Sequence, residues 1–203
     1  MRKFIYTTFF TLFSLPLYAN NTNELDNFLN NQDYYRFELN FQQLNTSQER
    51  KDYLFKHIYS GHAIVYWLLA NEFSQDIMAS KYVVQDKSQI DFTKRMIYTA
   101  LLITEQDAAV CMDRKSLNAA RSILYRFPQI TDFERRYFIN NIESMNKSVE
   151  FVENLKNRQD PKWVCLQYGD KMNYSIYGKT YNKSEFATLR AAATTKIVNT
   201  LNK

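Results

Sequence analysis

The sequence predicts an all-α fold, a single-domain bundle or array of about seven to eight helices. The chain has only three glycines and three prolines in 203 residues. A sandwich or barrel needs a turn roughly every 8–12 residues and would contain more of both. Apolar residues recur at helical spacing in most segments, and short polar links with helix-capping residues separate these segments. The three observations together favour helices throughout.

Residues 1–19 have the pattern of a secretory signal peptide. Arg2 and Lys3 precede an uncharged run, and the run ends at an acceptable cleavage site before Asn20. We expect cleavage after Ala19, which leaves residues 20–203 as one helical domain in the periplasm or outside the cell. The alternative is an uncleaved membrane anchor, for which the apolar run is short. No later segment is long and apolar enough for a second span.

Two helices are expected before residue 46. Asn21 and Glu24 fit a capping box that would open a short first helix. A second helical stripe runs from Tyr34 to Leu44.

The next helices flank a glycine. Thr46 and Glu49 form another capping box, and Gly61 interrupts or kinks the segment that follows it. For the apolar octet of residues 63–70 a helix is favoured over a buried strand, because the segment continues into a polar helical pattern. Residues 80–88 are interpreted as a loop or the end of a helix.

The stretch from Phe92 to Arg114 is the longest segment that the pattern predicts as a buried helix. No glycine or proline interrupts it, and its apolar residues cover two arcs of the helix surface. We therefore expect this helix at the centre of the fold. Asp107 lies inside the apolar surface, where an unpaired carboxylate would cost several kcal/mol, so we expect it to be a buried charge with a partner.

Three more helices are expected after the central one. Ser116 caps a helix that Pro128 ends, and Thr131 opens a long amphipathic helix that continues to Leu155. A short turn can follow Pro161, and the last helix begins at Ser184.

The two cysteines, Cys111 and Cys165, form no CxxC motif and have no metal-ligand spacing. In an oxidising compartment we expect them to form one disulfide. It would close a loop of about 55 residues, for which chain entropy gives roughly 4 kcal/mol. The alternative is two buried free thiols.

Charge and motifs exclude several classes of function. The formal charge of +5 falls to +3 once Arg2 and Lys3 are removed, and acidic and basic residues alternate along the chain. No run of like charges suggests a nucleic-acid partner. The sequence contains no GxSxG, HExxH, Walker A or GxGxxG motif and predicts no metal site or cofactor.

The segment near residues 166–182 is irregular and rich in tyrosine. It holds two of the three glycines and loses helical periodicity. Tyrosine mixed with Asn, Ser, Gly and Lys is typical of recognition loops, because tyrosine supplies contact area at low entropic cost. The alternative is a loop whose tyrosines merely pack on the helical body. The candidate partner-binding residues are Tyr168, Tyr174, Tyr177 and Tyr181.

Two groups of residues could carry chemistry. Glu105, Asp107 and Asp113 could supply the carboxylate pair of a cell-wall hydrolase. A bend at Gly61 could bring together the only two histidines, His57 and His62, which one continuous helix would hold apart. The simpler interpretation is that these groups are structural or solvated.

The leading hypothesis is a non-enzymatic exported helical protein that binds a protein partner. Small exported all-helical proteins with one disulfide and no catalytic motif are often binding or inhibitory proteins. This chain resembles that general type, including immunity proteins that neutralise toxins delivered between bacteria. The alternatives are the cell-wall hydrolase and a structural accessory of an envelope complex.

Overall fold

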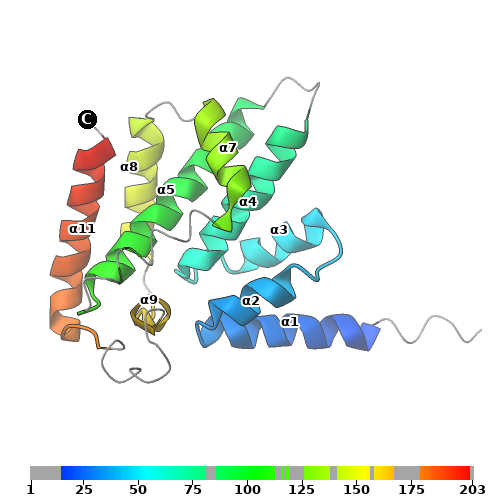
Figure 1. Ribbon diagram of the computed structural model, residues 1–203, viewed down its shortest axis with the longest axis horizontal. Helices are drawn as coiled ribbons and strands as arrows, with labels where there is room; N and C mark the ends of the chain where they lie inside the picture. Colours follow the sequence, from blue (N-terminus) through cyan, green and yellow to red (C-terminus); the bar gives the residue numbers. More distant parts are fainter. Residues whose placement is uncertain are drawn as a thin grey trace, which may run out of the picture. The chain divides into compact units, whose positions relative to one another are not determined.

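The computed structural model describes residues 15–80, 86–112, 116, 118, 126–137, 141–155, 158–166 and 179–201. The regular secondary structure among these residues is helical, and the β-type pairing among them is limited to one isolated bridge. The predicted all-α class is therefore confirmed. The chain divides into two compact units, residues 1–45 and 46–203 (Figure 1).

The first unit contains α1 (Leu15–Asn30) and α2 (Tyr34–Phe41), which pack against each other. The side chain of Asp33 caps α2 by accepting a hydrogen bond from the backbone N–H of Arg36 at 3.2 Å. Gln32 has a φ of 58°, and this left-handed residue reverses the chain between the two helices.

The start of α1 differs from the expected capping-box start at Asn21, because the helix already begins at Leu15. The expected cleavage after Ala19 therefore falls within α1. Most of the expected signal peptide, residues 1–14, lies outside the described residues. Export and cleavage remain predictions.

The second unit is arranged around one helix, α5 (Lys87–Ala109), which contacts α4, α8, α9 and α11. Figure 1 shows α5 crossing the middle of these helices. The prediction that this stretch is central is confirmed. The other elements of the unit are α3 (Ser47–Lys56), α4 (Ala63–Ala79), α7 (Pro128–Tyr137), α8 (Ile142–Glu153), α9 (Lys162–Leu166), the 3-10 turn η2 (Lys183–Glu185) and α11 (Phe186–Leu201).

Both ends of α5 lie about one turn earlier than predicted. Asp86 begins the helix, since its side chain accepts a hydrogen bond from the backbone N–H of Ser88 at 2.9 Å. The helix ends at Ala109, so Cys111 lies just beyond it, whereas the predicted range to Arg114 placed Cys111 inside the helix.

The turn before α4 requires a glycine. Gly61 has a φ of 73°, and a Cβ atom there would lie 2.7 Å from Cγ of Arg158. The octet that follows Gly61 is helical and fully buried in α4, as favoured. In α4, Trp67 donates a hydrogen bond from Nε1 to Oγ1 of Thr104 on α5 at 3.0 Å.

The prediction of one long helix from Thr131 to Leu155 is wrong. Helix α7 begins at Pro128, so Thr131 lies inside it, and a separate helix α8 begins at Ile142. The side chain of Asn141 caps α8 by accepting a hydrogen bond from the backbone N–H of Ser144 at 3.1 Å. The helix expected after Ser116 lies mostly outside the described residues.

The last two predictions are close to the structure. The turn after Pro161 is α9, and α11 follows η2, whose preceding Asn182 donates its backbone N–H to Oε2 of Glu185 at 3.1 Å. No helix among those described combines the length and the apolar character that crossing a bilayer requires.

Candidate binding site at the end of α5

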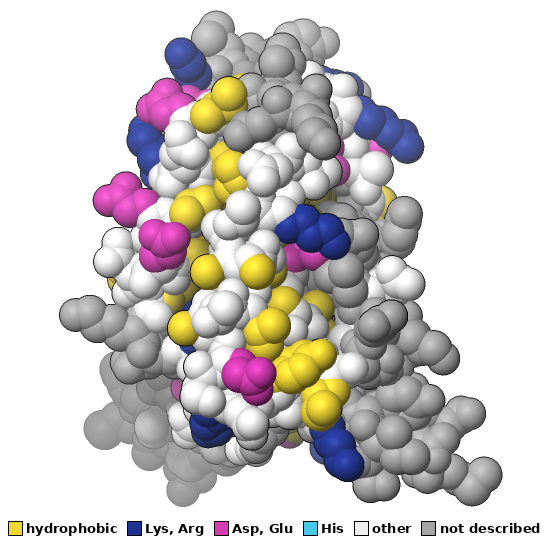
Figure 2. All heavy atoms as spheres, turned by 90° about the vertical axis from the view of Figure 1, so that its left-hand side faces the viewer, with side chains coloured by type: hydrophobic (Ala, Val, Ile, Leu, Met, Phe, Trp, Pro, Cys, Tyr) yellow, Lys and Arg dark blue, Asp and Glu magenta, His cyan; other side chains and the backbone are white. Residues whose placement is uncertain are grey.

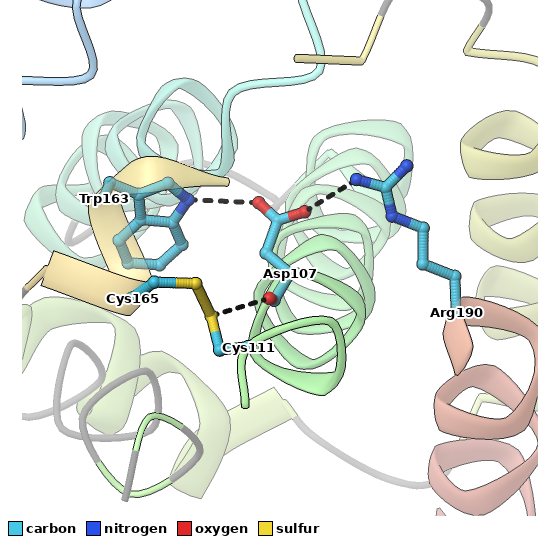
Figure 3. The surroundings of a disulfide bond; sticks show 5 residues. All are labelled: Asp107, Cys111, Trp163, Cys165 and Arg190. Atoms are coloured by element: carbon cyan, nitrogen blue, oxygen red, sulfur yellow. Dashed lines mark hydrogen bonds and ion pairs between the residues drawn. A yellow bond between two sulfur atoms is a disulfide. The ribbon is translucent and has the colours of Figure 1, made fainter. Parts of the chain in front are cut away.

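A disulfide joins Cys111, just after α5, to Cys165 in α9. The two Cα atoms are 5.5 Å apart, and both side chains are buried. The predicted pairing is confirmed. The bond holds α9 close to the end of the central helix (Figure 3).

A backbone bridge holds a second segment at the same residue. Cys111 and Thr180 form an isolated antiparallel bridge. Within it the N–H of Met112 donates to the carbonyl oxygen of Lys179 at 3.0 Å, and the N–H of Tyr181 donates to that of Val110 at 2.9 Å. Cys111 thus anchors both ends of the tyrosine-rich segment, by the disulfide at Cys165 and by the bridge at Thr180.

One of the four candidate tyrosines, Tyr181, lies among the described residues. Tyr168, Tyr174 and Tyr177 lie outside the described residues. Tyr181 is described, has 38% of its surface exposed and follows the bridge directly. Met112 directly follows the other bridged residue, Cys111, and is 52% exposed. Among the described residues, these two side chains are accessible apolar groups beside the anchor.

Asp107 lies one helical turn before the disulfide and is buried. Its Oδ1 forms an ion pair with Nη2 of Arg158, and its Oδ2 accepts a hydrogen bond from Nε1 of Trp163 at 3.0 Å. Nη2 of Arg190 is 3.7 Å from the same Oδ1. Figure 3 shows Trp163 and Arg190 pointing at this carboxylate from α9 and α11. The expected partner of Asp107 is therefore Arg158.

Two opposing effects act on the pKa of Asp107. Burial raises it, whereas the guanidinium groups of Arg158 and Arg190 and the indole N–H of Trp163 oppose the rise. Burial likewise lowers the pKa of Arg190. Because its ligands come from three different segments, Asp107 fixes α9 and α11 against α5.

A pocket of about 410 Å³ opens between α5 and α11 beside this anchor. Four alanines form its middle, and their short side chains leave the volume empty: Ala108 and Ala109 on α5 and Ala192 and Ala193 on α11. The other lining residues are Glu105, Cys111, Met112, Tyr181, Leu189 and Lys196.

The pocket has one apolar end and one charged end. Helix α11 runs antiparallel to α5, since Gln106 bonds Thr194 while Asp107 faces Arg190 (Figure 1). Glu105 and Lys196 therefore lie together at the end away from Cys111. Figure 2 faces the α11 side and shows hydrophobic side chains gathered below a neighbouring basic and acidic side chain.

The structure describes two of the three candidate hydrolase carboxylates, Glu105 and Asp107. Glu105 lines the pocket, whereas Asp107, two residues along the helix, is engaged by Arg158 and does not line it. Asp113 lies outside the described residues. Within the described part of the chain, no group of three or more His, Cys, Asp or Glu side chains is placed to hold a metal ion.

The two histidines lie on either side of Gly61 in the link between α3 and α4. His57 follows α3 and packs against Tyr53 with ring centroids 4.7 Å apart, while His62 precedes α4 and is buried. Burial, and secondarily the charge of His57, lower the pKa of His62 from 6.5 to about 4. A buried neutral histidine of this kind makes stability depend on pH.

We expect acidification from pH 6.5 to 4 to lower the free energy of unfolding by up to about 3 kcal/mol through His62. Its folded pKa lies below the unfolded value, so the unfolded chain binds the proton first. The stabilisation that neutral His62 contributes to the folded state is complete above pH 6.5. It decreases as the pH falls to about 4, and below that pH the free energy of unfolding no longer changes through His62. Urea unfolding of the wild type and of His62→Gln at several pH values measures it. Equal pH dependence of the two proteins would contradict the assignment.

Comparison with known proteins adds no relative. The chain matches no protein-family model, and no curated protein or solved structure matches it. Fold and site therefore define the class directly: an all-α protein whose single disulfide and backbone bridge meet at the end of its central helix.

The sequence did not indicate the pocket or the three side chains that surround the carboxylate of Asp107. The signal for the pocket was present as paired small residues, Ala108-Ala109 and Ala192-Ala193, but nothing local showed that they face each other. Arg158, Trp163 and Arg190 had no signal, because they follow Asp107 by more than 50 residues in the chain.

Proposed function

We propose that the protein is a non-enzymatic exported binding protein that recognises a protein partner in the periplasm or outside the cell. Inhibition of that partner, as in proteins that neutralise a toxin or an enzyme, is the role that suits a small helical protein of this kind. The observation that carries the proposal is the double anchor at Cys111. It fixes both ends of a tyrosine-rich segment next to an open apolar pocket.

The anchor supports recognition for an energetic reason. A loop with both ends fixed loses less conformational entropy on binding than a free one, so more of the contact energy remains as affinity. The neighbouring apolar groups, Tyr181 and Met112, are of the residue types enriched in interfaces. The sequence pattern of residues 1–19 and the disulfide both suit an oxidising compartment outside the cytoplasm.

Capture from the envelope fraction of the producing cells tests the proposal. The oxidised protein is used as bait, followed by affinity measurement with the captured partner. Replacing Tyr181 with Ala is expected to weaken that affinity about 30-fold, the size of a hot spot worth about 2 kcal/mol. Tyr174→Ala and Tyr177→Ala test the predicted recognition segment in the same way.

The matched control is Tyr59→Ala, because Tyr59 is 74% exposed and lies in the link between α3 and α4. It is expected to leave the affinity unchanged within about twofold. Tyr181→Ala should also leave thermal unfolding nearly unchanged. Equal effects of the two variants, or a large loss of stability in Tyr181→Ala, would contradict the proposal.

The hydrolase alternative rests on Glu105, the acidic residue that lines the pocket. Glycoside hydrolysis requires two carboxyl groups across the scissile bond, and Asp107 is held in an internal ion pair. This geometry favours binding over hydrolysis. Release of soluble fragments from peptidoglycan by the wild type, and its loss in Glu105→Gln, would reverse that preference.

A further inference from the structure

We infer that the pocket between α5 and α11 binds one apolar side chain of the protein partner together with the peptide group next to it. This inference names the anchor of the partner and rests on the proposed function. It follows from the size of the pocket, the chemistry of its two ends and the accessibility of its rim.

The size and lining of the pocket suit a large apolar side chain together with the peptide group attached to it. A volume of about 410 Å³ is within the usual range for small ligand sites. The alanines of both helices give it an apolar middle, and Met112, Leu189 and Tyr181 close one end. Burying a leucine- or phenylalanine-sized group there would tighten binding roughly 10- to 150-fold.

The charged end selects the group attached to that side chain. Glu105 accepts hydrogen bonds and Lys196 donates them, and their charges cancel. A ligand group that complements both carries no net charge and offers a donor to Glu105 and an acceptor to Lys196. The peptide group has this character, with one N–H and one C=O. A bare hydrocarbon lacks both, and a free carboxylate lacks the donor.

The rim leaves this site open to a macromolecule. Tyr181 and Met112 are exposed on the apolar side, and Lys196 is exposed on the other. The pocket also adjoins the bridge that anchors the tyrosine-rich segment. A partner that contacts Tyr181 and Met112 therefore lies at the mouth of the pocket.

Blocked amino acids test the inference without knowledge of the partner. N-acetyl-phenylalanine amide carries one apolar side chain between two peptide groups. N-acetyl-glycine amide lacks the apolar side chain, and toluene lacks the peptide groups. Protein labelled with ¹³C in its alanine methyl groups reports the binding by NMR. We expect saturable shifts at Ala108, Ala109, Ala192 and Ala193, and none at Ala187 and Ala191, which lie on α11 outside the pocket.

Variants on one helix provide the matched pair. Ala193→Phe fills the pocket and is expected to weaken binding of N-acetyl-phenylalanine amide at least about tenfold, while Ala191→Phe changes it less than about twofold. Lys196→Met removes an exposed charge. It should weaken binding of N-acetyl-phenylalanine amide about three- to tenfold without changing the binding of toluene.

Several outcomes would overturn the inference. Shifts at Ala191 equal to those at Ala193, or no saturable shift at any alanine, would exclude the pocket as the site. Toluene binding as tightly as the blocked phenylalanine would exclude recognition of the peptide group. The outcome is independent of the capture experiment: failure to capture a partner counts against the proposed function, whereas failure here counts against the pocket alone.

Discussion

Replacing Arg158 with Met is expected to lower the free energy of unfolding by about 3–5 kcal/mol, the cost of breaking a buried ion pair from one side. The carboxylate of Asp107 would remain buried without its main partner. Arg190 lies 3.7 Å away and can offset only part of the loss. Urea unfolding at neutral pH, followed by circular dichroism, measures the effect.

The matched control is Arg135→Met. Arg135 forms an ion pair with Asp132 at 3.5 Å, but both side chains are mostly exposed, so less than about 1 kcal/mol is expected. A double variant, Asp107→Asn with Arg158→Met, should be more stable than Arg158→Met alone because it removes the stranded charge. If Arg158→Met were no more harmful than Arg135→Met, the Asp107 cluster would not stabilise the fold as described.

Loss of the disulfide is expected to have an effect of similar size. Cys111 and Cys165 are separated by 54 positions, and the entropy of closing such a loop in the unfolded chain corresponds to about 4 kcal/mol. Unfolding of the wild type with and without reductant, and of the double variant Cys111→Ala/Cys165→Ala, gives this value. Reductant should not change the stability of the double variant.

The disulfide prediction has a functional part as well. Without the bond, the entry of the tyrosine-rich segment is no longer fixed at Cys111, whereas the bridge to Thr180 still holds its exit. We therefore expect the affinity for the captured partner to fall even at temperatures where the reduced protein stays folded. Unchanged stability after reduction would refute the stabilising role, and unchanged affinity would refute the functional one.

The sequence was sufficient to predict those features of the fold whose signals lie in nearby residues. The capping box of Thr46 and Glu49 is present at the start of α3, with Glu49 N–H donating to Oγ1 of Thr46 at 3.1 Å. The helical state of residues 63–70 followed from the polar helical pattern after them, and the central place of α5 followed from apolar residues on two arcs of its surface. The disulfide followed from having only two cysteines in a chain with an export pattern.

Errors arose where two local signals competed. Asp86 is a good helix-capping residue, but the apolar residues before it obscured the start of α5. Asn141 likewise caps α8, yet the helical spacing of apolar residues continues across it and suggested one long helix. In both cases a side chain that bonds to the backbone determined the boundary more strongly than hydrophobic spacing did.

The remaining features depend on contacts distant in sequence. The bridge between Cys111 and Thr180 joins residues in different parts of the chain, and neither segment has the alternating pattern of a strand. The ion pair of Asp107 with Arg158 spans 51 positions. Such pairs are set by the packing of α9 and α11 on α5, which a single sequence does not specify.

Amide hydrogen exchange at Met112 and Tyr181 tests most directly whether Cys111 anchors both ends of the tyrosine-rich segment. Their N–H groups form the two hydrogen bonds of the bridge. We predict exchange at least about tenfold slower than in an unstructured chain while the disulfide is intact, and faster exchange after reduction. Exchange at the unstructured rate in the oxidised protein would contradict it, because the exit of the segment would then not be held at the end of α5.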